Sequence, residues 1–201
     1  MQLLFAILSA AAAAVPAQAP APERPPLEAR RDYRVVYAGF TGQPTTWSWR
    51  AASRRLRIEA EGEWTLKDFR TGRSTRVNDA ARIGSPADAD PATLSPRPDA
   101  TYAYAGADEV AGHACQLWDV RDEVMTARYC LTADGVMLRQ EVSRFDGQPV
   151  SLTMEAKEVS IAPQPAGRFQ VPNGYQLVGG MEALARRLSK PGRQYGQDSA
   201  P

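Results

Sequence analysis

The sequence predicts a mainly β domain, an antiparallel sheet carrying one disulfide, in a protein that is exported. Several runs alternate apolar and polar residues with a period of two, at which successive side chains of a strand point to opposite faces. An apolar run opens the chain, and the only two cysteines are Cys115 and Cys130. Together these observations favour a sheet domain that folds in an oxidising compartment.

The first 17 residues have the pattern of a cleaved signal peptide. Residues 3–15 form an uninterrupted apolar run, and Val15-Pro16-Ala17 offers a small-x-small cleavage signal. The alternative, an uncleaved membrane anchor, would need about 20 apolar residues to cross a bilayer, and this run is shorter. We therefore expect a periplasmic protein whose mature chain begins at Gln18 and has no stable membrane span.

Three further regions follow the signal peptide. Residues 18–31 are rich in proline and alanine, without periodicity, and are expected to form a mobile linker. Residues 32–178 carry the period-two pattern and form the β domain. Residues 179–201 are expected to hold a short helix over about 180–189, with one apolar stripe, and a frayed tail.

Short connections between the alternating runs favour an antiparallel meander. The third run is the clearest, because Leu56 and Ile58 alternate with charged residues and predict one buried face and one solvated face. In the last run the apolar phase changes from even to odd positions near Lys157-Glu158, which predicts a β-bulge. The expected strands cover residues 33–40, 47–51, 55–61, 64–69, 101–105, 109–121, 126–133, 136–145 and 150–161.

A proline-rich stretch separates the two groups of strands. The segment between Gly84 and Ala100 contains four prolines, which exclude a regular strand or a long helix. Long structureless segments inside a domain often serve as lids or binding loops. The alternative, equally open, is a solvent-exposed loop that has no function of its own.

The two cysteines are expected to form a disulfide, since paired thiols are the simplest state of two cysteines in an exported chain. A hairpin turn centred on Asp122-Glu123 would place Cys115 directly opposite Cys130. Closing a loop of about 15 residues should stabilise the fold by roughly 3 kcal/mol. The spacing differs from the C-x-x-C pattern of redox-active dithiols.

Several function classes find no support in the composition. The 24 basic and 23 acidic residues are interleaved, so no cluster provides the field that nucleic acid would demand. The single histidine, His113, is more consistent with a hydrogen-bonded structural residue in a strand than with a general base. The sequence also contains no G-x-S-x-G motif. Two cysteines and one histidine make a poor zinc site. We expect no catalytic residue, no metal, no cofactor and no enzymatic activity.

Aromatic residues are the most informative remaining feature. A curved sheet can present tryptophans on its concave side, where they line an apolar cavity. The same residues can instead fill the hydrophobic core. Both interpretations stay open for the four tryptophans, Trp47, Trp49, Trp64 and Trp118. Alternation places the first two on one face, and the neighbouring strand supplies a similar face. The candidate apolar ligand-binding residues are therefore Trp47, Trp49, Leu56 and Ile58.

Three segments carry a resemblance to known proteins: VAGHACQLW (110–118), RYCLTADGVMLRQE (128–141) and FQVPNGY (169–175). Their pattern resembles a group of uncharacterised proteobacterial envelope proteins, which is similar to the lipoprotein-localisation-factor (LolA-like) superfamily. The resemblance implies an unclosed β-barrel wrapped around helical or loop plugs. Members with known activity carry lipoproteins or lipids in an apolar cavity, and related domains sense envelope stress. No carrier residue of that superfamily can be matched to a position here.

The expected function is therefore a periplasmic, non-enzymatic binding or carrier protein for an apolar ligand, a lipid or a lipoprotein acyl chain. The alternative is an envelope module that recognises a protein partner or senses stress. An enzyme using His113 or a carboxylate is the third reading. A continuous cavity would favour the first reading, and a filled barrel with an exposed apolar patch would favour the second.

Overall fold

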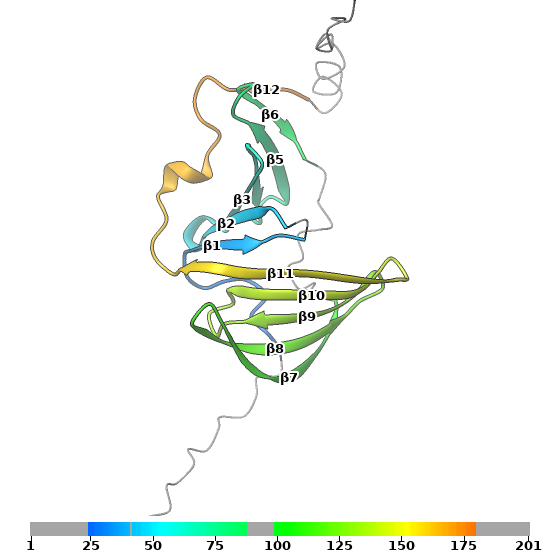
Figure 1. The fold of residues 1–201 in the computed structure, drawn as a ribbon. Coiled ribbons are helices and arrows are strands. Elements are labelled where there is room, and N and C mark those ends of the chain that lie inside the picture. The colour runs from blue at the N-terminus through cyan, green and yellow to red at the C-terminus, as the bar shows by residue number, and fades with distance from the viewer. Residues whose placement is uncertain (1–23, 41, 88–98, 180–201) are drawn as a thin grey trace, which may run out of the picture.

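A computed structural model describes residues 24–40, 42–87 and 99–179, which form a single 12-stranded sheet (Figure 1). The expected mainly β, curved and unclosed antiparallel sheet is confirmed. The predicted signal peptide and the predicted helix over 180–189 lie outside the described residues. Within these residues, no helix is long and apolar enough to cross a membrane.

Short connections join most strands, and the longer ones lie between β6 and β7 and between β11 and β12. Two 3-10 helices are present among the described residues: η1 (Ala51–Ser53) between β2 and β3, and η2 (Ala166–Phe169) between β11 and β12. The strands are β1 (Tyr33–Ala38), β2 (Pro44–Arg50), β3 (Arg55–Ala60), β4 (Glu63–Asp68), β5 (Arg73–Asn78), β6 (Ile83–Pro86), β7 (Thr101–Val110), β8 (His113–Arg121), β9 (Met125–Leu131), β10 (Met137–Phe145), β11 (Gln148–Ser160) and β12 (Gln176–Leu177).

The sheet consists of two meanders that share one central pairing. Its order is β12-β6-β5-β4-β3-β2-β1-β11-β10-β9-β8-β7, so that β1 and β11 join the meander β1–β6 to the meander β7–β11. Every pairing is antiparallel except that of β12 with β6. In Figure 1 the two meanders form the upper and lower halves of the molecule. Among the described residues β7 and β12 do not pair with each other, so the barrel stays open.

The larger hydrophobic core lies on the face of the sheet that carries Tyr33, Val35 and Trp47, which we call the inner face. Side chains from β1–β3 and from β8–β11 pack into this one cluster, so the sheet must curve around it. The Tyr37 hydroxyl, buried in the cluster, donates to the Met137 carbonyl at 2.6 Å and ties the two meanders together.

A second core covers the opposite, outer face of β3–β5, and on β3 the sequence predicts this face to be charged and solvated. That prediction is wrong, because the segment after β11 packs over this face. The Arg57 guanidinium lies 3.8 Å from the centre of the Trp64 ring and donates to the Arg168 carbonyl at 3.0 Å. Arg55 donates to the Phe169 carbonyl at 3.0 Å. The buried members of this outer core are Trp64, Leu66, Val77 and Phe169.

Three strand predictions need correction. The expected single strand over 109–121 is two strands, β7 and β8, because Ala111 and Gly112 both have positive φ (50° and 75°) and form a two-residue hairpin turn. Strand β5 was not predicted, since its mostly polar sequence RSTRVN hides the alternation. Strand β6 occupies the start of the segment expected to be a structureless loop over 84–100, and residues 88–98 of that loop lie outside the described residues.

The β-bulge predicted near Lys157-Glu158 is confirmed. Val36 pairs with Glu158, whereas the next residue, Tyr37, pairs with Ala156, so Lys157 is the extra residue on β11. The bulge reverses which face of β11 receives alternate side chains. Met154 and Ala156 therefore reach the inner core from even positions, and Val159 packs against it from an odd position.

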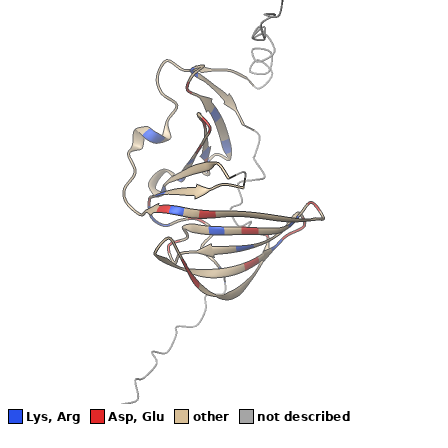
Figure 2. Cartoon of the chain, in the orientation of Figure 1, with Lys and Arg blue, Asp and Glu red and all other residues tan. Residues whose placement is uncertain are grey.

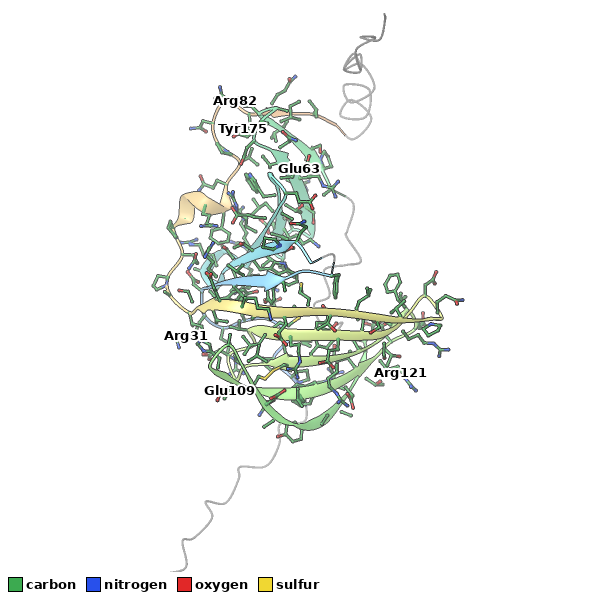
Figure 3. All side chains as sticks on the ribbon, in the orientation of Figure 1. Arg31, Glu63, Arg82, Glu109, Arg121 and Tyr175 are labelled. Atoms are coloured by element: carbon green, nitrogen blue, oxygen red, sulfur yellow. A yellow bond between two sulfur atoms is a disulfide. The ribbon has the colours of Figure 1, made fainter. Side chains whose placement is uncertain are left out.

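The disulfide between Cys115 and Cys130 is present, with its Cα atoms 5.4 Å apart (the sulfur sticks of Figure 3). The predicted register is wrong by two residues, since Leu117 and not Cys115 lies opposite Cys130. The cause is the turn, in which the Asp122 carboxylate accepts hydrogen bonds from the N–H groups of Val124 and Met125. This centres the hairpin one residue later than expected, and the bridge is diagonal.

Charges of both signs alternate along β8–β11 (Figure 2). Arg128 forms an ion pair with Asp119 at 2.7 Å, and Arg139 lies 2.6 Å from Asp108 and 2.9 Å from Glu141. Opposite charges in these pairs, within a strand or between strands, neutralise one another, as the interleaved sequence predicts. This face offers no single-sign field for a polyanion.

Candidate functional site

The register brings the four predicted ligand-binding residues together. Trp47 pairs with Ile58 and Trp49 with Leu56, so all four side chains share the inner face of β2 and β3. The two tryptophans are only 6% and 4% exposed. Trp118 also belongs to the inner core, whereas Trp64 lies on the outer face and cannot contribute to the same site.

Residues 24–31, which we call the strap, cover this aromatic surface. They belong to the linker expected over residues 18–31, and the described part of it contacts the β domain. At one end the Arg24 guanidinium lies 5.9 Å from the Tyr102 ring of β7. Further along, Pro26 to Ala29 line the same cavity as Trp47 and Trp49. The strap is apolar enough at Leu27 and its prolines to replace water on the inner face.

Few polar contacts hold the strap. The Trp49 indole N–H donates to the Ala29 carbonyl at 2.8 Å, and the Arg30 N–H donates to the Asp134 carbonyl at 2.8 Å. At the surface Glu28 forms an ion pair with Arg54, and Arg31 lies 3.6 Å from Asp134. The strap is therefore fastened at its second half, beside the start of β1.

Gly135 makes room for the strap. A Cβ atom built at this position would lie 2.8 Å from the Glu28 carbonyl oxygen and 3.2 Å from Ala29 Cα, and its φ is +85°. Gly135 lies in the turn between β9 and β10, in which the Thr132 N–H donates to the Val136 carbonyl at 2.9 Å. Glycine suits this position for two reasons: it adopts the left-handed backbone conformation without strain, and it has no side chain that would clash with the strap.

Asp32 fixes the point where the strap becomes β1. One carboxylate oxygen accepts from the Ala51 N–H at 2.8 Å, and the other accepts from the Gln164 N–H at 2.9 Å. Sequence reasoning missed both Asp32 and Gly135 as determinants of the site. No local pattern marks them, because their partners are distant in the chain.

A cavity of about 40 Å³ remains beneath the strap, room for about one water molecule. Trp47, one of the residues that line the cavity, has a buried Nε1 donor without a hydrogen-bond partner among the described residues. With the strap seated, an acyl chain cannot enter. The cavity lining comprises Pro26, Leu27, Glu28, Ala29, Tyr33, Trp47, Trp49, Leu56, Phe69, Leu131, Gly135 and Met137.

The chemistry available in this lining is contact and hydrogen bonding. Its titratable members are Glu28, which faces Arg54, and Tyr33, whose pKa burial raises far above its ordinary value. A buried neutral phenol is neither a base nor a nucleophile at neutral pH. His113 is half-buried at the start of β8 and does not line the cavity. In the described part of the chain, no cluster of His, Cys, Asp and Glu could hold a metal ion.

Comparisons with known proteins support the fold. No family model matches the chain, and no curated protein matches it. A solved structure of an uncharacterised conserved protein from Thermus thermophilus is 13% identical with a TM-score of 0.53, over 75% of this chain and 91% of that chain. The MucA/MucB complex structure of Pseudomonas aeruginosa gives 17% identity and a TM-score of 0.51, over 76% of this chain and 59% of that chain.

A structure of PNGF-II is also similar, with 11% identity and a TM-score of 0.50, over 79% of this chain and 33% of that chain. At these identities the likeness shows the fold alone. The likeness to the MucA/MucB complex structure agrees with the mainly β, unclosed sheet expected from the sequence.

Proposed function

We propose that the protein is an exported, non-enzymatic binding protein that holds an apolar ligand on the inner face, at Trp47, Trp49, Leu56 and Ile58. One observation carries the proposal: among the described residues, the segment that covers this aromatic surface is an irregular strap and not a helix or a second sheet. The strap has no strand pairing with the surface it covers. A ligand can replace it without breaking the sheet.

An acyl chain of a lipid or lipoprotein is the simplest such ligand. Aromatic and aliphatic side chains dominate the lining, and burial of each CH₂ group on such a surface contributes about 0.8 kcal/mol. Because only about 40 Å³ is free beneath the strap, the chain must displace the strap to bind. The proposed event is therefore an exchange of one apolar occupant for another.

Tryptophan fluorescence titrated with fatty acids of increasing length tests the proposal. Affinity should rise about fourfold for each added CH₂ group and be nearly independent of salt. Trp49→Phe should reduce the emission change, whereas Trp64→Phe, on the outer face, should leave it intact. Mass spectrometry of native protein should show co-purified lipid. The proposal fails if no chain length shifts the emission and the native protein carries no lipid.

A polypeptide is the second candidate ligand, favoured by the hydrogen bond from the Trp49 indole to the Ala29 carbonyl. This contact shows that the surface accepts a peptide backbone. The Pseudomonas aeruginosa neighbour is a complex of two proteins, MucA and MucB, which agrees with a protein ligand. Interaction with an envelope protein is the corresponding function.

Export is part of the proposal and has its own test. The Val15-Pro16-Ala17 signal motivates it. Amino-terminal sequencing of the protein recovered from its host should start at Gln18. An intact Met1 on membrane-bound protein would contradict a cleaved signal peptide.

A further inference from the structure

The contacts of the strap indicate which ligand the inner face is built to hold. We infer that the groove lined by Tyr33, Trp47, Trp49 and Leu56 is a seat for an extended polypeptide segment of a partner protein, which binds by replacing the strap. The inference rests on the proposed binding role of the same site, and it specifies the ligand class. The strap is then an internal ligand that competes with the partner.

The two indole donors support a polypeptide. The Trp49 indole already donates to a backbone carbonyl of the strap at 2.8 Å, and the Trp47 indole is buried without a partner among the described residues. An acyl chain offers acceptors only at its head, whereas a polypeptide offers a carbonyl at each residue. A buried donor left unpaired is unfavourable, so an occupant that reaches both indoles is preferred.

The two tryptophans follow each other along β2 with the repeat of an extended chain. Trp47 and Trp49 are two residues apart on β2, which places their Cα atoms about 6.6 Å from each other. Carbonyls that point the same way along an extended segment repeat at about the same interval. The strap bends at Leu27 and Glu28 and pairs with the Trp49 indole alone, whereas an extended segment would offer a carbonyl along the whole groove.

The strap is attached weakly enough to be replaced. Among the described residues, its one backbone hydrogen bond to the rest of the protein joins Arg30 N–H to the Asp134 carbonyl. The side chains of Glu28 and Arg54 are 38% and 48% exposed, and ion pairs at such exposure contribute little. Release of the strap would expose Trp47 and Trp49 to solvent. An exposed apolar patch of this kind favours the binding of another apolar segment.

The seat also specifies the chemistry of the segment. Pro26 and Leu27 lie against apolar side chains, Ala29 passes close to Gly135, and Glu28 faces Arg54. A partner segment should therefore combine proline or aliphatic residues with a carboxylate and then a small residue. The sequence of residues 24–31, RPPLEARR, is a probe with these features.

Fluorescence anisotropy of this labelled peptide tests the inference on the full-length mature protein. Leu27→Asp in the protein should loosen its own strap by placing a charge against the apolar lining, and Glu28→Lys should do so at the surface beside Arg54. Both variants should bind the peptide at least tenfold more tightly than the wild-type protein, whose tethered strap competes at high effective concentration. Arg30→Ser, a strap substitution at an exposed side chain, is the matched control and should behave as wild type.

Two further substitutions test the indole contacts. Trp49→Phe in the Leu27→Asp protein should weaken peptide binding about threefold to tenfold, which corresponds to one lost hydrogen bond. Trp118→Phe, also buried in the inner core but outside the groove lining, should not. A peptide carrying aspartate at the Leu27 position should not bind. Circular dichroism confirms that each variant is folded.

The outcomes separate this inference from the proposed function. If fatty acids bind the loosened variants and the peptide does not, the polypeptide inference is overturned and the apolar-ligand proposal stands. If neither binds, both fall. Peptide binding that is insensitive to Trp49→Phe would place the peptide elsewhere and would also overturn the inference.

Discussion

Replacement of Gly135 by alanine is the most direct test of how the strap is seated. The added Cβ atom would lie 2.8 Å from the Glu28 carbonyl oxygen and 3.2 Å from Ala29 Cα. Both neighbours are backbone atoms, which cannot rotate out of the way as a flexible side chain can. The strap must therefore lift from the turn that contains Gly135.

The size of the effect follows from the contacts that are lost. A left-handed φ of +85° at alanine costs about 1 kcal/mol. Lifting the strap also breaks the hydrogen bonds from Arg30 to Asp134 and from Trp49 to Ala29, worth about 1 kcal/mol each. Gly135→Ala should thus lower the free energy of unfolding by about 3 kcal/mol.

Gly147→Ala is the matched control, because Gly147 has a φ of +73° and no atom within 4 Å of its added Cβ. It should lower the free energy of unfolding by about 1 kcal/mol, the backbone cost alone. Urea unfolding measures both values. Limited trypsin digestion should cleave Gly135→Ala faster after Arg30 and Arg31, because the lifted strap is accessible. Equal losses of stability and equal cleavage in the two variants would refute the seating of the strap on Gly135.

Three other predictions concern the frame around the site. Replacing Cys115 and Cys130 with serine should lower the free energy of unfolding in urea by about 2–4 kcal/mol with an unchanged circular dichroism spectrum, and equal stability would contradict a structural bridge. Phe169→Ala should lower it by about 3–5 kcal/mol, because this side chain is 1% exposed in the outer core; a loss below about 1 kcal/mol would show that the outer core contributes little. The hydrogen bond from Arg128 lowers the pKa of Asp119, against an opposing effect of burial, so the stability from this pair is present above the ordinary value of 3.8 and lost as pH falls below it. Melting temperatures of wild type and Asp119→Asn should therefore differ at pH 7 and converge in acid, and a constant difference would contradict the pairing.

Local alternation determined most of the strands and one part of the site. Trp47 and Trp49 had to share a face whatever the register, and the short turn before β3 placed Leu56 and Ile58 beside them. The parity change near Lys157 located the bulge for the same reason, since side chains of a strand alternate with a period of two. These features depend only on neighbours in the chain, and the sequence was sufficient to predict them.

Tertiary structure decided what covers each face of the sheet. The charged face of β3 is half-buried because the segment around Phe169 returns to it, and Trp64 faces this outer core instead of the proposed ligand site. The strap lies on Trp49 because Gly135 leaves space for it and Asp32 fixes its end. Such contacts join residues separated by tens to more than a hundred positions, and no periodicity records them. Whether an apolar face meets solvent, a ligand or its own chain is a property of the packed molecule.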